Sequence, residues 1–368
     1  MPVLRAHPLS QKRFYLALIA LLILSVYFFS PSPPPSPTRD PALDARFAAA
    51  LARPPPPGAP PYAPARIEAQ WAANAREWGN ELCARVAAER ELWQRWLDGA
   101  AAGGAGTPLE AWSTLGAAGL GEEAAVRLEP LAGYLRDPRP SCPSVGLTPL
   151  LTRDTEDAKA HIFLDPAYYA LLAASLRRAP AAGQPQPRAL LFDIGSTLWQ
   201  GSPDSETGLS GASWLVDAYG KLGIEFDAVH AWEASPKNAR EYFGAMPLAL
   251  AAKWHFYNFP VTSPAIAGSG GPGPENVLEV LRTVARPGDF VVFKIDIDAE
   301  VLEEKIVLEL LADDALGALV DDFYFEHHVR NSVMGPRGWG NVQLRDVQDS
   351  IGLFQALRRR GIRAHSWP

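Results

Sequence analysis

The sequence is poor in positive charge and in cysteine. Its 34 Lys and Arg residues are outnumbered by 41 Asp and Glu, which gives a formal net charge of −7. This argues against nucleic acid as the main partner, because binding to phosphates needs a basic surface. No Asn-x-Ser/Thr glycosylation sequon occurs, which neither supports nor excludes a lumenal location. Nothing in the sequence points to a protein partner.

The two cysteines, Cys83 and Cys142, flank a tryptophan-rich segment. In an oxidising compartment they could pair and close that segment. Two cysteines also occur together without a bond, so the sequence leaves both states open. The tryptophans between residues 71 and 96 recur near helical spacing, which favours a packing face over a platform for a carbohydrate or cofactor.

A continuous apolar run extends from Phe14 to Phe29, preceded by basic residues and by no acidic residue. As a helix it would cover about 24 Å, which suits the thinner membranes of the early secretory pathway. A cleaved signal peptide is the alternative, but cleavage needs small residues where Phe28 and Phe29 stand. We therefore expect a single-pass type II protein of the Golgi or endoplasmic reticulum. Residues 1–13 would be a cytosolic tail, residues 14–29 a transmembrane signal anchor, and the rest lumenal.

Composition divides the remaining chain into three parts. Residues 30–64 are rich in proline and favour an extended stem. Residues 65–187 carry apolar side chains near helical spacing and predict a helical region. From 188 to 368, strand and helix patterns alternate. This alternation predicts an α/β fold, a Rossmann-like, mainly parallel sheet with helices on both faces.

The expected elements follow from these patterns. Before residue 188 we expect helices at 65–97, 108–134 and 165–177. After it we expect strands at 189–194, 228–232, 254–259, 289–297, 322–326 and 362–366. Helices are expected between them at 211–221, 236–243, 275–285, 300–312 and 342–360.

Two strand ends carry polar residues with a recognisable layout. The first strand ends in Asp193-Ile-Gly195-Ser196, and the second ends before Glu233. In Rossmann-like folds such a glycine lets a ligand approach the backbone, and the later acid accepts hydrogen bonds from ribose hydroxyls. The layout predicts a nucleoside-containing cofactor at this edge of the sheet. Glu233 has an equally simple second interpretation, a capping or surface acid.

Three stretches are similar in order and spacing to class I S-adenosylmethionine-dependent methyltransferases, and most of all to the FkbM-type family. They are Phe-Asp-Ile-Gly-Ser at 192–196, Trp-Glu-Ala-Ser-Pro at 232–236 and Lys-Ile-Asp-Ile-Asp-Ala-Glu at 294–300. The resemblance covers the C-terminal half, from Ala189 onward, and implies S-adenosyl-L-methionine as cofactor. It places Asp193 and Gly195 beside the methionine part, Ser196 in the same loop, Glu233 at the ribose hydroxyls and Asp296 between cofactor and substrate.

His327 and His328 follow the strand expected at 322–326. Together with Asp296 they are the candidate catalytic residues, since an imidazole can take a proton from a substrate hydroxyl. The alternative is that both histidines pack beneath the loop 331–340. Within that loop, Trp339 is either a stacking platform for a sugar or purine ring or an anchor of the loop.

The leading hypothesis is O-methyl transfer to a glycan or another hydroxylated small molecule, with no metal. The first alternative is a metal-dependent glycosyltransferase, in which Mg²⁺ or Mn²⁺ is held by Asp296, Asp298, Glu326 and His328. The second is a catalytically inactive binding module with a methyltransferase fold. It is suggested by the absence of further glycines directly after Gly195, by the polar segment 201–208, which is either a lid or a remodelled loop, and by Ala299 in place of the family's glycine.

Overall fold

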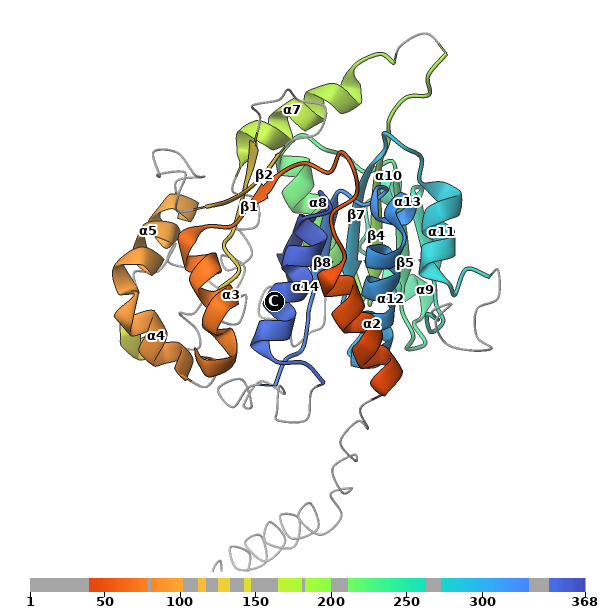
Figure 1. Ribbon diagram of the computed structural model, residues 1–368. Coiled ribbons are helices and arrows are strands. Elements are labelled where there is room, and N and C mark those ends of the chain that lie inside the picture. Colours follow the sequence, from red (N-terminus) through yellow and green to blue (C-terminus); the bar gives the residue numbers. More distant parts are fainter. Residues whose placement is uncertain are drawn as a thin grey trace, which may run out of the picture. The chain divides into compact units, whose positions relative to one another are not determined.

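The computed structural model describes residues 40–78, 81–101, 112–116, 125–132, 142–146, 165–180, 183–199, 211–262, 273–330 and 344–367 (Figure 1). The predicted signal anchor at 14–29, the polar segment 201–208 and Trp339 lie outside these residues. Within them, no helix is both long enough and apolar enough to cross a membrane.

A sheet of six parallel strands lies at the centre of the C-terminal part, in the order β6-β5-β4-β7-β8-β9 (Figure 1). The chain adds strands on one side of β4, crosses back to its other side, and continues outward from β7. The prediction of a mainly parallel α/β sheet is confirmed. The strands are β4 (Ala189–Ile194), β5 (Ala228–Trp232), β6 (Trp254–Tyr257), β7 (Phe290–Ile295), β8 (Asp322–Phe325) and β9 (Arg363–Ser366).

Helices cover both faces of this sheet, which is why its inner strands are apolar on both sides. In β4, Phe192 packs into the core on one face and Leu191 into the core on the other. The first face is covered by α11 (Val277–Val284), α12 (Glu300–Ala312) and α14 (Val347–Arg358). The second is covered by α7 (Pro166–Arg177), α8 (Gly211–Lys221) and α9 (Ala239–Phe243). Two short helices, α10 (Leu248–Ala251) and α13 (Asp314–Gly317), lie in connections.

Helix starts follow the capping residues in the sequence. Asp165 caps α7, with proline at the first helical position as predicted, and Asp346 begins α14 in a capping box. Helix α9 begins later than expected, at Ala239, because the Asn238 side chain accepts hydrogen bonds from the first turn. The predicted strands and helices after residue 188 are therefore confirmed, with differences at their ends.

The region before residue 188 differs more from the expectations. The expected helix 65–97 is divided into α3 (Arg66–Trp78), α4 (Leu82–Ala88) and α5 (Arg90–Ala101). The helix expected at 108–134 is wrong in its described residues, which form strands β2 (Ser113–Gly116) and β3 (Ala125–Leu128). These pair with β1 (Tyr62–Ala63) in a small antiparallel sheet. Strand β1 lies far from β2 in the sequence, so the local periodicity of residues 108–134 could not indicate this pairing.

The proline-rich stretch 30–64 is not an extended stem throughout. Residues 41–52 form helix α2, whose Leu43, Phe47 and Ala50 are buried against α12 and α14. The Arg345 guanidinium lies 3.9 Å from the centre of the Phe47 ring. The prolines therefore flank a packed helix, and the stem prediction is corrected for this segment.

Tryptophans and the cysteine pair stabilise the helical region from inside. Trp71, Trp93 and Trp96 are buried, in agreement with a packing role. Cys83, in α4, is bonded to Cys142, next to the short 3₁₀ helix η3 (Pro143–Val145). The sequence left the state of these cysteines open, and the fold brings them together.

The helical region and the sheet belong to one compact unit, Arg39–Pro368. Helix α3 packs against α14. At their contact, Arg358 of α14 is buried between Glu68 of α3 and Glu129, which follows β3. The two regions distinguished by composition therefore share a core.

We expect His230, in β5, to make the fold sensitive to acid. Burial, His255 and Arg188 lower its pKa to about 4, against about 6.5 in the unfolded chain. The unfolded chain therefore binds the extra proton first, so stability is complete above pH 6.5 and falls as the pH drops through 4. His230→Phe keeps the stacking on Phe192 and should reduce the loss measured by urea unfolding at pH 7 and pH 4 by up to about 3 kcal/mol.

The exposed neighbour His255 supplies the control for this measurement. His255→Phe should reduce the loss between pH 7 and pH 4 by much less than His230→Phe, because burial of His230 is the largest cause of its lowered pKa and the charge of His255 a smaller one. Some acid sensitivity should remain in both variants, because burial also lowers the pKa of His327, to about 3. An unchanged loss in His230→Phe would contradict the assignment.

Candidate functional site

The carboxyl ends of the parallel strands meet at one edge of the sheet, beside the point where the strand order reverses. Ligands of open α/β sheets bind at this place. Polar residues of β4, β5, β7 and β8 or of the loops after them lie here, and among them are the described candidate site residues named from the sequence, with the exception of His327.

Lys294, in β7, holds two of the candidate acids. Its ammonium lies 3.0 Å from the Asp193 carboxylate and 3.4 Å from that of Asp296. Burial opposes the charge of Lys294, but the two carboxylates raise its pKa above the usual value. The fully buried Asp193 is therefore engaged by Lys294, and its predicted place beside a cofactor would be an indirect one. A lone lysine within an apolar strand was the sequence signal for this residue, and sequence reasoning did not use it.

Only glycine fits at position 195, because the backbone of Asp296 lies against it. Its φ of +90° lies in the left-handed region, and a Cβ there would stand 1.6 Å from the carbonyl oxygen of Asp296. The N–H groups of Gly195 and Ser196 both donate to the Trp232 carbonyl, at 3.0 and 2.7 Å. The Ser196 hydroxyl lies 2.8 Å from that of Tyr242. The loop after β4 is thus fixed against its neighbours on both sides.

Glu233 lies half-buried at the carboxyl end of β5. One carboxylate oxygen accepts a hydrogen bond from the Ser235 N–H at 2.7 Å, and the other is 3.9 Å from the Lys237 ammonium. Asn258 donates to the Glu233 carbonyl at 2.8 Å. The Glu233 side chain therefore caps the turn after β5, and it also lies next to the β4 loop, as the cofactor interpretation requires.

Asp296 and Asp298 do not form the pair expected from a strand. Strand β7 ends at Ile295, and Asp298 has a left-handed φ of +54°, so the two side chains do not share a strand face. Asp296 is directed to Lys294 and is a quarter exposed. Burial alone would raise the pKa of Asp296, but Lys294, Glu326 and His328 together hold it below its usual value.

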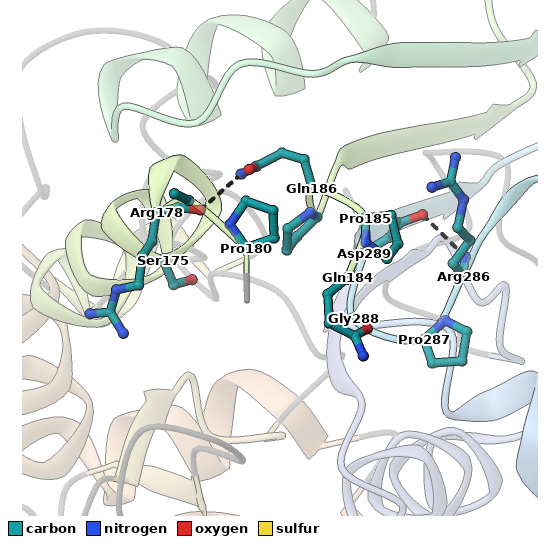
Figure 2. A pocket seen from close by; sticks show the side chains of 12 residues that line it. Ser175, Arg178, Pro180, Gln184, Pro185, Gln186, Arg286, Pro287, Gly288 and Asp289 are labelled. Atoms are coloured by element: carbon teal, nitrogen blue, oxygen red, sulfur yellow. Dashed lines mark hydrogen bonds between the residues drawn. The ribbon is translucent and has the colours of Figure 1, made fainter. Parts of the chain in front are cut away.

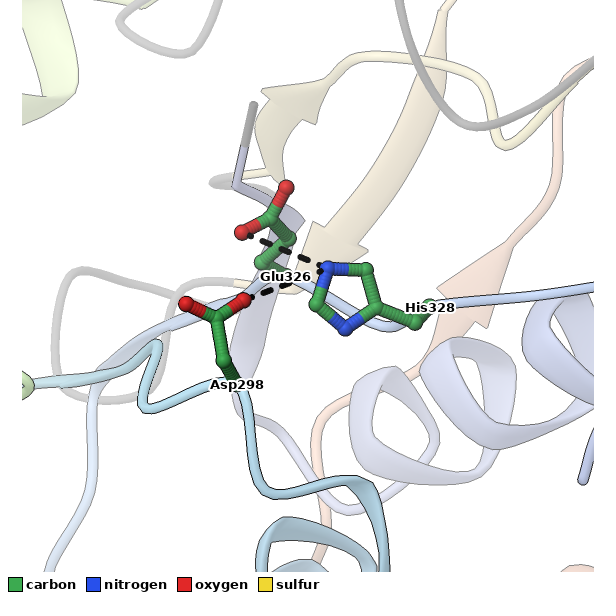
Figure 3. A group of neighbouring side chains, drawn as sticks. All are labelled: Asp298, Glu326 and His328. Carbon is green, nitrogen blue, oxygen red and sulfur yellow. Dashed lines mark ion pairs between the residues drawn. The ribbon is translucent and has the colours of Figure 1, made fainter. Parts of the chain in front are cut away.

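Asp298, Glu326 and His328 come together in a group next to Asp296 (Figure 3). The His328 Nε2 lies 3.8 Å from an Asp298 oxygen and 3.7 Å from a Glu326 oxygen. Asp298 comes from the loop after β7, and the other two residues come directly after β8. Three of the four predicted metal ligands are therefore close enough to act together, and Asp296 is not among them.

His327 does not belong to the site. It is buried, stacks on Phe325 with ring centres 5.0 Å apart, and its Nδ1 lies 2.9 Å from the Ser350 hydroxyl of α14. Successive side chains after a strand point to opposite sides, so His328 reaches the site while His327 enters the core. The prediction of His327 as a catalytic residue is wrong.

Glu303, in α12, is a buried acid beneath the site that sequence reasoning missed. It accepts a hydrogen bond from the Ile297 N–H at 2.8 Å and so supports the loop that carries Asp298. Burial, together with the charges of Asp296, Glu326 and Asp298, raises the pKa of Glu303 to about 8. It stands in a helix start rich in glutamate, where nothing in the local pattern distinguishes a buried acid from an exposed one.

A cavity of about 310 Å³ lies at the opposite edge of the sheet, where β4 and β7 begin (Figure 2). It is bordered by the end of α7, by the linker before β4 and by the turn before β7. Gln186 of the linker donates to the Arg178 carbonyl at the end of α7, and the Arg286 N–H donates to Asp289 within the turn before β7. It is distant from the carboxyl ends of the strands and does not correspond to the predicted cofactor site.

Comparisons of the chain with protein-family models, with curated proteins and with solved structures gave no match.

Proposed function

We propose that this protein is an S-adenosylmethionine-dependent O-methyltransferase with a Rossmann-like catalytic domain. One observation carries the proposal. The loop Asp193–Ser196 ends β4, which borders the place where the strand order reverses, and the acid Glu233 ends the adjacent parallel strand β5. A nucleoside cofactor fits such an arrangement, with its ribose at the acid and its remaining part along the neighbouring loop.

The sulfonium of the cofactor supplies the methyl group and the driving force, so the protein needs to position an acceptor and remove a proton. His328 is the residue proposed for proton removal, since it lies at the same edge of the sheet and is partly exposed. Asp296 lies between the β4 loop and this histidine, in keeping with a boundary between cofactor and acceptor. The proposed acceptor is a glycan or another hydroxylated small molecule.

We further propose a signal anchor at 14–29 and a lumenal catalytic domain in the Golgi or endoplasmic reticulum. The bond between Cys83 and Cys142 supports this location, because disulfides persist in the oxidising compartments of the secretory pathway.

Each alternative function has an observation in its favour. The group Asp298, Glu326 and His328 favours the metal-dependent glycosyltransferase. The inactive binding module is favoured by the loop after β4, whose N–H groups at Gly195 and Ser196 donate to Trp232. The methyltransferase remains the better proposal because the β4 loop lies at the reversal of strand order and Glu233 lies next to it, at the end of β5.

Calorimetric binding of S-adenosylmethionine and of its demethylated product tests the proposal. Glu233→Ala should weaken both by at least about tenfold, since it removes a charged acceptor of ribose hydrogen bonds. Glu241→Ala, an exposed acid in α9, is the control and should bind like the wild type. The protein used should contain the whole unit Arg39–Pro368, because a fragment without α3 would leave Arg358 without Glu68.

Two results would reject the methyltransferase. The first is no binding of either compound to a protein that unfolds cooperatively. The second is metal-dependent binding of a nucleotide sugar in place of them, which would favour the glycosyltransferase. Absence of both kinds of binding would favour the inactive module.

A further inference from the structure

The group of Asp298, Glu326 and His328 has the composition of a metal site rather than of a proton relay alone. It contains one imidazole and two carboxylates, which come from two different loops at the carboxyl edge of the sheet (Figure 3). We propose that these three residues bind a divalent transition-metal ion, for which Mn²⁺ is the best candidate.

The distances in the group suit this role. All three candidate ligand atoms lie within 4.8 Å of one another, and Nε2 of His328 is 3.7 and 3.8 Å from the nearest oxygens of Glu326 and Asp298. Ligands about 2.1 Å from a common ion stand roughly 3.0 to 3.4 Å apart when they are neighbours. The two distances from Nε2 exceed this spacing by roughly 0.3 to 0.8 Å, so both carboxylates would close on the ion as it binds, and the exposed Asp298 side chain has room to move.

The ligand types select the ion. Carboxylates alone suit Mg²⁺ and Ca²⁺, whereas an imidazole favours transition metals. One histidine with two carboxylates fits Mn²⁺ best and Zn²⁺ next. Three protein ligands leave positions on a six-coordinate ion for water or for oxygens of a bound molecule.

The charges around the group also favour a cation. Asp296 lies against Lys294, and the imidazole of His328 lies between the carboxylates of Asp298 and Glu326. Beneath them lies Glu303, whose pKa is raised by its burial and, to a smaller extent, by the negative charge of its neighbours. Glu303 also supports the loop of Asp298 through the Ile297 N–H. Such a neighbour that orients a ligand loop is typical of metal sites.

A metal ion at this site would select acceptors by the oxygen atoms that they can place on the ion. With the ion bound, His328 would be a ligand, so the proton of a hydroxyl on the ion would pass to water and not to this histidine. The resulting alkoxide oxygen would take the methyl group from the sulfonium, and the demethylated cofactor would leave. A second oxygen beside the alkoxide would complete a chelate. The acceptor class is therefore a molecule with two neighbouring oxygens, such as a diol or a hydroxy acid. This role of the ion rests on the proposed methyl transfer, whereas the binding of the ion does not.

The test is titration of the full chain, purified in detergent and freed of metal with a chelator, with MnCl₂ alone. Calorimetry gives the affinity, and water-proton relaxation reports water bound to the ion. We expect one ion per chain. Asp298→Asn, Glu326→Gln and His328→Gln should each weaken binding at least tenfold, and Asp217→Asn, an exposed acid in α8, should not change it. Asparagine tolerates the left-handed backbone of residue 298, so this variant keeps the loop conformation.

Absence of stoichiometric Mn²⁺ binding would overturn the proposal, and so would binding that all three variants leave unchanged. Cofactor binding measured without metal separates the two proposals. A protein that binds Mn²⁺ through these residues but no S-adenosylmethionine has the metal site without the proposed function. A protein that binds S-adenosylmethionine but no Mn²⁺ supports the proposed function and lacks the metal site.

Discussion

Arg358→Met is expected to lower the free energy of unfolding by about 4 kcal/mol, because it leaves carboxylates buried without their cation. The guanidinium is fully buried and lies 2.9 Å from a Glu129 oxygen and 3.4 Å from a Glu68 oxygen. It also donates to the carbonyls of Glu129 and Ala364, each at 2.9 Å. Urea unfolding at neutral pH measures the loss.

A second arginine of the same helix region, Arg359, gives the control for this experiment. It is half-buried and has a long contact of 3.4 Å with the Leu51 carbonyl, so Arg359→Met should cost less than about 1 kcal/mol. Adding Glu68→Gln and Glu129→Gln to Arg358→Met should recover part of the stability, since the uncompensated charges are removed. If Arg358→Met and Arg359→Met cost the same, the buried ion group does not hold α3 to α14.

Lys294→Met is the second change with a large expected effect, again about 4 kcal/mol. Lys294 is the cation of the fully buried Asp193, and methionine fills a similar volume without a charge. The substitution should also affect the candidate site. Burial of Asp296 raises its pKa, and Lys294 lowers it, so without Lys294 the pKa of Asp296 should rise. Thermal and urea unfolding measure the stability, and cofactor binding measures the effect on the site.

The double variant Lys294→Met/Asp193→Asn shows whether the stability is lost through the unpaired charge of Asp193 or through lost packing of Lys294. Asparagine keeps the outline of Asp193 and removes its charge, so the double variant should be more stable than Lys294→Met alone. An equal loss in both would mean that lost packing, such as the contact of Lys294 with Trp367, matters more than the unpaired carboxylate.

The sequence predicted the sheet well because both of its faces are covered. A strand buried on two faces is a continuous apolar run, and β4 and β7 carry such runs between turns. Capping residues such as Asp165 marked helix starts for the same reason, since the signal and its partner lie within one turn.

The site was predicted only in part, because its geometry depends on how strand ends meet. The sequence placed Asp296 and Asp298 on one strand face, but the strand ends before both. It also treated His327 and His328 as a pair. In the fold, His327 contacts Ser350 of α14, whereas His328 lies next to Glu326. These outcomes follow from the exit direction of each loop, which no local pattern encodes.

By itself, the sequence determined the parallel α/β arrangement, the order of its elements and the position of polar residues at strand ends, because these follow from local periodicity and capping. The tertiary structure alone decided that Lys294 neutralises Asp193, that Gly195 accommodates the Asp296 carbonyl, and that Cys83 meets Cys142. It also decided that the residues before the sheet share its core through Arg358. The physical reason is that each of these contacts joins residues distant along the chain, and burial and charge balance act only once the fold has brought them together.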